Sequence, residues 1–437
     1  MSAPLSLSTR ADQTEQPPIT YFMEQGLQNP NLISLAAGLV DPDSLPIGEV
    51  SAACAEVLAD PRTARSALQY GMTQGYRPLR EKLFHRLLDM DGLTGREATY
   101  TADDIVLSTG SQQLLYLLGE LLLDPGDIVI TEAPSYFVYH GILTSLGIRT
   151  LAVGLDRDGM RTDLLEDLLK DLERSGELPR VKLIYTVDYF QNPTGLTLSL
   201  PRRHHMLELA RRFSKTHRLL ILEDAAYREL RFAGYDVPSI KSLDQSNEQV
   251  ILAMTFSKPL APGLKTGYGV LPRDLVGPLL RFKGNHDFGS SNFNQHVLDC
   301  LLGNGVFQRH AETLREAYRS KRDALLGALE AEFPPGQSVR WTQPDGGMCV
   351  WLTLPPGVAT GQSSRFMAEC LREGVIYVPG ECCHVKNGDV PLNEARLCYG
   401  VATHDELREA ARRLGRAART VMGTEKIRMR AFAGCKG

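Results

Sequence analysis

The 437-residue chain lacks the features that mark several common classes of protein. Its eight cysteines include no Cys-x-x-Cys pair, and the adjacent Cys382 and Cys383 suit neither a zinc knuckle nor an ordinary disulfide. The longest apolar runs stop well short of a membrane span, and the first residues hold no apolar core of signal-peptide length. A formal charge of −4, from 48 basic and 52 acidic residues, gives no field that would recruit nucleic acid. We therefore expect a soluble, cytoplasmic protein with reduced thiols that binds no metal, membrane or nucleic acid.

The pattern of apolar residues predicts an α/β fold. Between about residues 50 and 310, short strand-like runs alternate with longer amphipathic stretches, which is typical of a mostly parallel sheet. The expected strands are Ile105–Ser108, Ile128–Thr131, Lys182–Thr186, Leu219–Leu222, Val250–Thr255 and Gly267–Leu271. The expected helices include Gln112–Leu123, Leu200–His217 and Asn294–Leu302. Beyond residue 310, short strands and helices predict a smaller α+β domain, with a last helix over His404–Val421.

The most informative segment is Thr255–Lys265, which reads Thr-Phe-Ser-Lys-Pro-Leu-Ala-Pro-Gly-Leu-Lys after an apolar run. A lysine at the end of a buried strand loses its proton easily, because burial disfavours the charged form. A neutral amine can condense with a carbonyl group, which Schiff-base chemistry requires. A Ser-Lys pair alone is common and would more simply be a strand followed by an exposed lysine. The significance of Lys258 therefore depends on other segments.

Three upstream segments place polar groups where expected strands end. The N–H groups of Ser111 and Gln112 open a helix, where they can bind a phosphate or merely form a helix cap. Asn192, in Gln-Asn-Pro-Thr-Gly, can donate to a ring hydroxyl or stand in an ordinary Asn-Pro turn. Asp224 ends another buried strand, where a carboxylate needs a cation such as a protonated pyridine nitrogen, or else caps a helix.

The order of these segments, Gly-Ser-Gln, Asn-Pro-Thr-Gly, Asp-Ala-Ala-Tyr and Thr-Phe-Ser-Lys, resembles that of the class I and II aminotransferases of pyridoxal-phosphate fold type I. The similarity extends from Ile33 to Arg396 and is strongest to the 2-aminoadipate and aromatic aminotransferases, through Gln69–Gly71, Gly75–Arg80 and Gly346–Met348. The resemblance implies a large domain with a mostly parallel seven-stranded sheet and a smaller α+β domain. It divides the chain into an arm with part of the small domain (1–48), the large cofactor-binding domain (49–310) and the C-terminal small domain (311–437).

The resemblance also implies a role for individual residues toward pyridoxal 5'-phosphate. Lys258 matches the lysine that forms the aldimine and moves the Cα proton, and Asp224 matches the partner of the pyridine nitrogen. Arg396 matches the arginine that binds the substrate α-carboxylate, beside Gly38 in a segment that closes over the substrate. The remaining matches hold the cofactor or its substrate, namely the ring-oxygen partners Asn192 and Tyr227, the phosphate ligands Ser111, Gln112, Ser257 and Lys265, the stacking residue Tyr136, and Tyr70, which reaches the phosphate of a neighbouring subunit. A homodimer with shared sites follows from the last match.

The sequence departs from the family pattern at Lys265, where an arginine is usual seven residues after the Schiff-base lysine. Lysine keeps the charge but loses the planar fork, so we interpret it as a tolerated substitution, the alternative being a reshaped phosphate site with altered chemistry. The usual Gly-Gly-x-Pro is also replaced by Ala-Gly-Leu-Val from Ala37. The polar stretch Asn285–Ser291 is more simply a surface turn than a contact to a polar substrate. The Cys382–His384 loop is more simply a pair of buried thiols beside a histidine than a metal or nucleophile site.

The expected reaction is transfer of an amino group between an L-amino acid and a 2-oxo acid, with Lys258 as general base. An apolar or aromatic side chain on the substrate suits a site with one arginine and aromatic neighbours. The alternative keeps the cofactor but performs elimination, replacement, cyclisation or racemisation, for instance in secondary metabolism. A transcription regulator with an aminotransferase-like domain is rejected, because fewer than about 35 residues precede the similarity and a DNA-binding module needs more.

Overall fold

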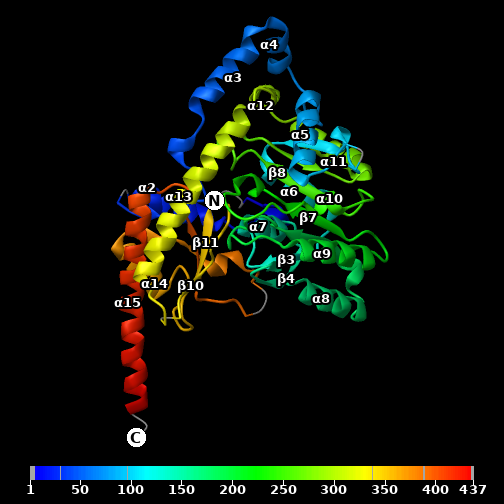
Figure 1. Ribbon diagram of the computed structural model, residues 1–437. Helices are drawn as coiled ribbons and strands as arrows, with labels where there is room; N and C mark the ends of the chain where they lie inside the picture. The colour runs from blue at the N-terminus through cyan, green and yellow to red at the C-terminus, as the bar shows by residue number, and fades with distance from the viewer. Residues whose placement is uncertain (1–4, 30, 96, 337, 387–388, 435–437) are drawn as a thin grey trace.

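The computed structural model describes all residues except 1–4, 30, 96, 337, 387–388 and 435–437, and its centre is a large twisted sheet (Figure 1). The strands of the large sheet are β2 Ile105–Ser108, β3 Ile128–Ala133, β4 Arg149–Asp156, β5 Gly159–Met160, β6 Val181–Thr186, β7 Leu220–Asp224, β8 Val250–Thr255 and β9 Gly267–Val270. Their order is β2-β9-β8-β7-β6-β3-β4-β5. The pairs β4–β3–β6–β7–β8 are parallel, whereas β9 runs antiparallel to β2 and β8. The predicted, mostly parallel α/β sheet is therefore confirmed.

One difference is the number of strands, since seven were expected, six of them were assigned to segments of the sequence, and eight form. The strand left unassigned is β4, in which only two of eight residues are buried, so that it makes no continuous apolar run. The additional strand, β5, has two residues and pairs antiparallel with β4 through Leu155 and Met160. A segment of this length has no periodicity, so the apolar pattern could not reveal it.

Helices cover both faces of the large sheet, which explains why its strands read as continuous apolar runs. Successive residues of β7 illustrate this, because Leu222 belongs to the core beneath α6 (Gly110–Leu122) and α7 (Phe137–Ser145), whereas Ile221 belongs to the core beneath α8 (Thr162–Arg174) and α9 (Leu200–Arg212). The helices around the sheet are α5 Arg77–Asp91, α6 Gly110–Leu122, α7 Phe137–Ser145, α8 Thr162–Arg174, α9 Leu200–Arg212, α10 Ile240–Leu243, α11 Arg273–Asp287 and α12 Asn292–Gly303. Helix α9 ends before the expected His217, where the Ser214 hydroxyl accepts the Leu219 N–H outside any helix.

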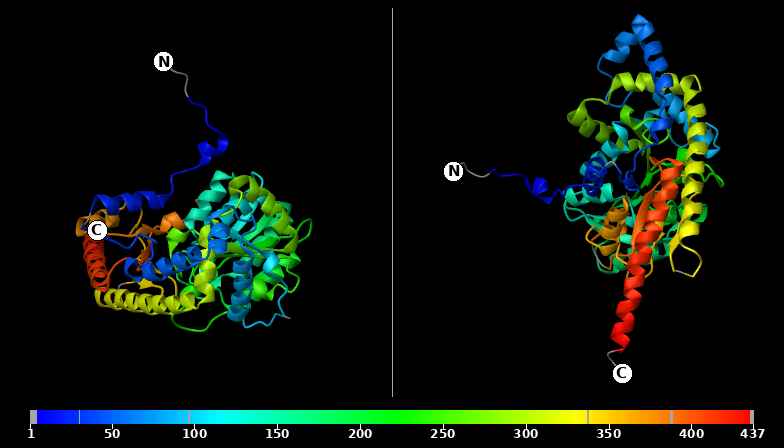
Figure 2. Two further views of the ribbon diagram at one scale, coloured as in Figure 1. Left: turned by 90° about the horizontal axis from the view of Figure 1, so that it is seen from above. Right: turned by 90° about the vertical axis from the view of Figure 1, so that its left-hand side faces the viewer.

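The second part of the fold is a four-stranded antiparallel sheet in the order β10-β11-β14-β13. Its strands are β10 Arg340–Trp341, β11 Cys349–Thr353, β13 Val378–Pro379 and β14 Glu394–Cys398. The helices that accompany it are α13 Val306–Glu332, α14 Arg365–Glu373 and α15 His404–Gly434. Helix α13 is long enough to run from the large sheet to the small one (Figures 1 and 2). The predicted smaller α+β part is confirmed.

The N-terminal part of the chain contacts both parts of the fold. Arg10 forms an ion pair with Glu120 of α6, whereas the Leu35 carbonyl accepts a hydrogen bond from Cys398 of the small sheet. Strand β1 Ile33–Ser34 pairs with β12 Val375–Ile376. The helices of this part of the chain are α1 Thr9–Gln13, α2 Pro18–Gln28, α3 Ile47–Ala59 and α4 Pro61–Leu68. Among the described residues, no helix combines the length and the apolar character needed to cross a membrane.

Candidate active site

Lys258 lies three residues beyond the end of strand β8, and its side chain reaches the N-terminal segment. Its Nζ donates a hydrogen bond of 2.7 Å to the carbonyl oxygen of Gly38. Burial lowers the pKa of Lys258, because the charged amine loses its hydration, and the nearby Arg396 acts in the same direction. No carboxylate of the described residues forms an ion pair with this amine. The site therefore favours the neutral form of Lys258, which a nucleophile or a general base requires.

Asp224 is the last residue of β7 and is buried, with 4% of its surface exposed. The hydroxyl of Tyr185 donates to its Oδ2 at 2.9 Å, and the Ala226 N–H donates to its Oδ1 at 3.2 Å. Burial raises the pKa of Asp224 to about 6, and these two donors only partly offset the effect. Within the described part of the chain, no cation is paired with this carboxylate. A buried carboxylate without a counter-charge indicates a place for a cationic ligand group.

The first turn of α6 packs directly on strand β9. Gly110 has a φ of +72°, and the preceding Thr109 makes no side-chain capping hydrogen bond to the helix. A Cβ atom on Gly267 would lie 2.6 Å from the Ser111 nitrogen, so only glycine allows this close approach. The N–H groups of a helix start attract anions. The hydroxyl of the predicted phosphate ligand Ser257 accepts a hydrogen bond of 3.0 Å from Thr255 at the end of the neighbouring strand β8.

Arg396, on β14, brings the small sheet to the same site and is buried, with 2% exposed. Its Nη1 donates to Asn192 Oδ1 at 2.9 Å, and its Nη2 donates to the Ala36 carbonyl at 2.7 Å. Asn192 in turn donates to the Tyr227 hydroxyl at 3.3 Å. Within the described residues the buried Nε of Arg396 has no hydrogen-bond partner, so the guanidinium keeps an unused donor. The geometry suits a carboxylate ligand.

Three predicted residues lie at the edge of the cluster formed by Lys258, Asp224 and Arg396, or outside it. Tyr136 precedes α7, and its hydroxyl donates to Gln112 at 3.4 Å, which joins the ring to the start of α6. Tyr70 is 82% exposed and meets the ring of Phe288 edge to face, so it does not reach the cluster of its own chain. Lys265 is exposed and follows a short helix with a φ of +48°.

The two segments interpreted as structural each have internal partners. The first was expected to be a surface turn, but helix α11 extends to Asp287 and only the residues from Phe288 onward form a bend. In the stretch Asn285–Ser291, Asp287 accepts hydrogen bonds from Gln113 at 2.7 Å and from Lys283 at 2.8 Å. In the other loop, His384 contacts Glu394 at 2.9 Å, and Cys383 is fully buried. The described residues contain no group of three or more histidine, cysteine or acidic side chains that could hold a metal ion.

The structure adds a network that sequence reasoning missed, centred on the buried Glu132 of β3. Its carboxylate accepts hydrogen bonds from the Thr186 hydroxyl at 2.6 Å and from Gln191 Nε2 at 2.7 Å. Gln191 also donates to the Pro134 carbonyl at 2.9 Å, and so joins the loop that carries Tyr136 to the loop that carries Asn192. Burial raises the pKa of Glu132 to about 7. Gln191 belongs to the Gln-Asn-Pro-Thr-Gly segment that the sequence analysis singled out, but no pattern in the sequence indicated Glu132 as its partner.

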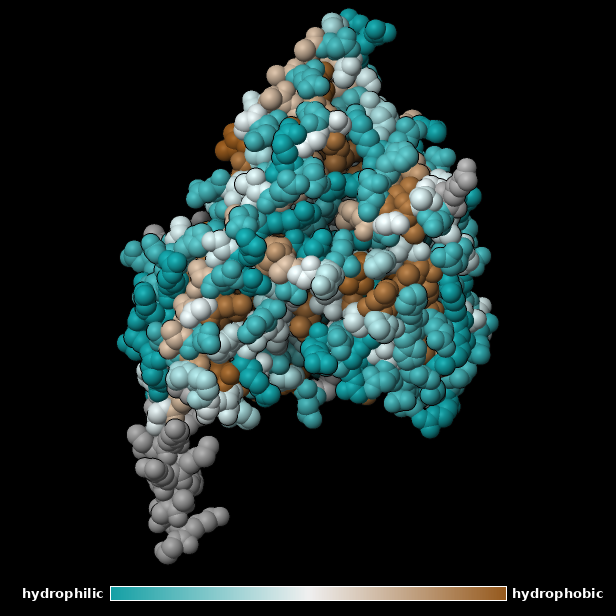
Figure 3. Space-filling model, viewed as in Figure 1, coloured by the Kyte–Doolittle hydropathy of each residue, from teal (hydrophilic) through white to brown (hydrophobic). Residues whose placement is uncertain are grey.

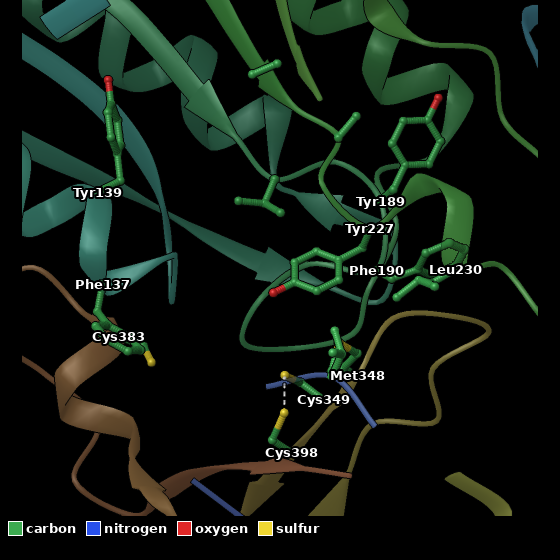
Figure 4. Packing of buried hydrophobic residues seen from close by; sticks show 14 of the residues in the cluster. Phe137, Tyr139, Tyr189, Phe190, Tyr227, Leu230, Met348, Cys349, Cys383 and Cys398 are labelled. Atoms are coloured by element: carbon green, nitrogen blue, oxygen red, sulfur yellow. Dashed lines mark hydrogen bonds between the residues drawn. The ribbon is translucent and has the colours of Figure 1, made fainter. Parts of the chain in front are cut away.

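A second missed feature is a pair of thiols, Cys349 and Cys398, whose sulfur atoms are 3.8 Å apart. Figure 4 shows the two sulfur atoms facing each other near the ring of Tyr227, with Cys383 and Phe137 on another side of the site. The cysteine spacing in the sequence gave no signal, because the two residues are 49 positions apart.

Comparisons with known proteins place the chain among enzymes. A family described as aminotransferase class I and II matches residues 30–414. The chain is 35% identical over 396 residues to the aromatic-amino-acid aminotransferase 1 of Thermococcus litoralis, covering 91% of the chain and 90% of the relative. It is 34% identical to the 2-aminoadipate transaminase of Thermus thermophilus, over 90% of the chain and 92% of the relative. Its fold matches a Pyrococcus horikoshii kynurenine aminotransferase, solved with PMP and kynurenine, with a TM-score of 0.87 at 33% identity over 95% of the chain and 97% of that structure.

Proposed function

Because the chain belongs to the class I and II aminotransferases, we propose that Lys258, Asp224 and Arg396 are the residues with which it moves an amino group between an L-amino acid and a 2-oxo acid. The enzyme is a transferase that depends on pyridoxal 5'-phosphate. When bound, this cofactor accepts the amino group and withdraws negative charge from the substrate Cα. The single observation that carries the assignment of residues is the buried, cation-free Asp224, which lies in one site with a lysine whose neutral form is favoured.

The residues of the site fit the cofactor. Asp224 would hold the protonated pyridine nitrogen, which supplies the cation that this carboxylate lacks. The start of α6, with Ser111 and Gln112, would hold the phosphate together with Ser257 and Lys265. Further contacts to the cofactor would come from Tyr136, Asn192 and Tyr227 of the same chain and from Tyr70 of a neighbouring copy.

Lys258 would hold the cofactor covalently and would then move the proton of the substrate Cα. Burial lowers its pKa and so increases the share of neutral amine, the form that can take up this proton. The Gly38 carbonyl accepts the Lys258 hydrogen bond in the free enzyme, so the amine is held in place before substrate arrives.

Arg396 binds the substrate α-carboxylate and so fixes the direction of the Cα–H bond. A carboxylate is a stronger acceptor than the amide oxygens of Ala36 and Asn192, which occupy the guanidinium now. The Phe137 ring lies 5.4 Å from the Arg396 guanidinium. This ring and Tyr136 support an apolar or aromatic side chain on the substrate, as do relatives named for aromatic amino acids and kynurenine.

We further propose a cytoplasmic homodimer in which each copy completes the other's site. Large hydrophobic side chains are exposed beside Tyr70, namely Leu68 and Met72 next to it in the chain and Phe288 against its ring. Figure 3 shows hydrophobic patches among hydrophilic side chains at the end of the molecule formed by α3 and α12. The described cysteines are all free, which suits a reducing compartment.

The test is a single turnover with purified holoenzyme and one amino acid at a time, without a 2-oxo acid. We expect aromatic and large apolar amino acids to convert the bound cofactor to pyridoxamine phosphate, with an equal amount of 2-oxo acid. Lys258→Ala should abolish both covalent cofactor and turnover. Steady turnover without any pyridoxamine form would refute the assignment and favour elimination or replacement. Sedimentation of the holoenzyme tests the dimer separately.

A further inference from the structure

Cys349 and Cys398 lie opposite each other on neighbouring strands of the small sheet. They are Cα partners in the antiparallel pair β11–β14. Both are buried, with 3% and 1% of their surfaces exposed, and the Cys349 thiol donates to the Cys398 sulfur at 3.8 Å. The pair lies within electrostatic reach of Lys258 and Arg396.

The hydrogen bonds of the ladder define the type of this pair. Tyr399 N–H donates to the Met348 carbonyl at 3.0 Å, one rung beyond the two cysteines. Hydrogen-bonded and non-hydrogen-bonded rungs alternate in an antiparallel ladder, so the cysteine rung is non-hydrogen-bonded. In agreement, the Cys398 N–H donates away from β11, to the Leu35 carbonyl at 2.7 Å.

Non-hydrogen-bonded rungs bring side chains closest, with Cα atoms about 4.5 Å apart. This separation lies within the range of about 4.4–6.8 Å that disulfides bridge. To reach a bond length of about 2.05 Å, the two sulfur atoms must approach by roughly 1.8 Å from their present 3.8 Å. Rotation of the two side chains, with a small adjustment of the strands, suffices.

The surroundings make one of the two thiols the better nucleophile. The hydrogen bond from Cys349, and then the positive charge of Arg396, lower the pKa of Cys398. Arg396 lies two residues before Cys398 on the same strand, so both side chains face the same side of the sheet. Tyr227 and Cys383 also face this region.

We propose that Cys349 and Cys398 form a redox modification site, which a small peroxide closes to a disulfide beside the arginine that binds the carboxylate. The Cys398 thiolate attacks one oxygen of hydrogen peroxide, which forms an S–O bond, breaks the O–O bond and releases hydroxide. The Cys349 sulfur then attacks the Cys398 sulfur, which forms the S–S bond and expels a second hydroxide. The two thiol protons convert the two hydroxides to water, so the protein loses two electrons and the peroxide gains them. A peroxide has two heavy atoms, so it can enter by the route that an amino acid must use.

Closure of this bond acts on substrate binding through the backbone of β14. Movement of Cys398 shifts Arg396 two residues away and loosens the bond from the Cys398 N–H to Leu35. A misplacement of about 1 Å in a catalytic site can cost about 100-fold in rate. We therefore expect oxidation to lower kcat/KM by about 10- to 100-fold, mainly through KM for the amino acid.

The experiment exposes holoenzyme to hydrogen peroxide, blocks remaining thiols and maps the peptides by mass spectrometry. We expect one new linked pair, the peptides of Cys349 and Cys398, lacking two hydrogen atoms relative to their sum. Activity should fall with the same time course and return after dithiothreitol. The linkage does not depend on the proposed function, whereas the loss of activity does, so failure of one can be told from failure of the other.

Two variants separate this site from other oxidation. Cys349→Ala should form no link and keep its activity under peroxide for longer than the wild type, whereas Cys370→Ala, a buried thiol on α14, should respond as the wild type does. Recovery of Cys398 as a sulfinic acid without a link would overturn the proposal, as would equal inactivation of Cys349→Ala. If the first variant fails to fold, the peptide map of the wild type decides alone.

Discussion

Removal of the Tyr185 hydroxyl tests how Asp224 is kept ionised. In Tyr185→Phe, Asp224 loses the donor at 2.9 Å and keeps only the Ala226 N–H at 3.2 Å. The ring itself remains packed on Tyr139, whose centroid lies 4.1 Å away. A hydrogen bond to a charged group contributes about 1.5–3 kcal/mol, which corresponds to a rise of about 1–2 in the pKa of the carboxyl group.

The sign of the expected change follows from the form that Asp224 must take. Tyr185 stabilises the ionised carboxylate, so its loss raises a pKa that burial has already raised to about 6. Only the ionised carboxylate can pair with a protonated pyridine nitrogen, so activity in Tyr185→Phe should be lost at a higher pH as the solution is acidified. We expect the acid limb of kcat/KM to move up by about 1 pH unit and kcat/KM at pH 7 to fall about 2-fold, since a rise of about 1 in a pKa of about 6 halves the ionised fraction at this pH.

Tyr139→Phe is the matched control for this experiment. The Tyr139 hydroxyl is buried in the same ring stack and has no hydrogen-bond partner among the described residues, so its removal should leave the pH profile unchanged. Superimposable profiles for Tyr185→Phe and the wild type would refute the role given to this hydroxyl. A shift of equal size in both variants would show that ring packing, rather than the hydrogen bond, is responsible.

Three further substitutions have expected outcomes. Asp224→Asn should abolish turnover yet stabilise the cofactor-free protein against unfolding by up to about 3 kcal/mol at pH 7. Burial raises the Asp224 pKa from 3.8 to about 6, so the ionised carboxylate destabilises the folded state above about pH 4. Thermal unfolding should therefore show the gain in stability at pH 7 and no gain at about pH 4. Gly267→Ala should weaken cofactor binding at least about 10-fold, since its Cβ would meet the Ser111 backbone at 2.6 Å, whereas Gly263→Ala, with open space around its Cβ, should titrate as the wild type. Arg396→Lys should raise KM for the amino acid by about 10- to 100-fold with a smaller change in kcat, because the planar fork is lost; an unchanged KM would contradict its role.

The sequence predicted the large sheet well because its strands are buried on both faces. Each expected strand forms, and β8 Val250–Thr255 has the expected bounds. The pattern failed where a strand is mostly not buried, as in β4, where a strand has very few residues, as in β5, and where a helix ends early, as α9 does before Ser214. Apolar periodicity reflects burial over several residues, so it does not predict very short strands or the residue at which a helix ends.

The residues of the site that follow strand ends could also be predicted, since their spacing from each strand is local. Glu132 and Tyr185 could not, although both lie in or beside predicted strands, because the sequence does not say which face of a doubly covered sheet a residue joins. The contact between Cys349 and Cys398 could not be predicted for a different reason. Their contact depends on the register of two strands whose cysteines are 49 positions apart in the chain, and register is fixed only by the folded ladder.

The N-terminal segment shows how such distant contacts prepare the site for an amino acid. The Ala36 and Gly38 carbonyls are two residues apart and accept hydrogen bonds of 2.7 Å from Arg396 and Lys258, respectively. One stretch of backbone thus holds the side chains of Arg396 and Lys258 through hydrogen bonds to uncharged carbonyl oxygens. A carboxylate forms a stronger bond to the guanidinium than an amide carbonyl does, so a substrate carboxylate bound in the proposed way would replace Ala36 at a net gain in free energy. The contacts that position Arg396 are therefore weak enough for the substrate to replace, which a salt bridge to an acidic residue of the chain would not be.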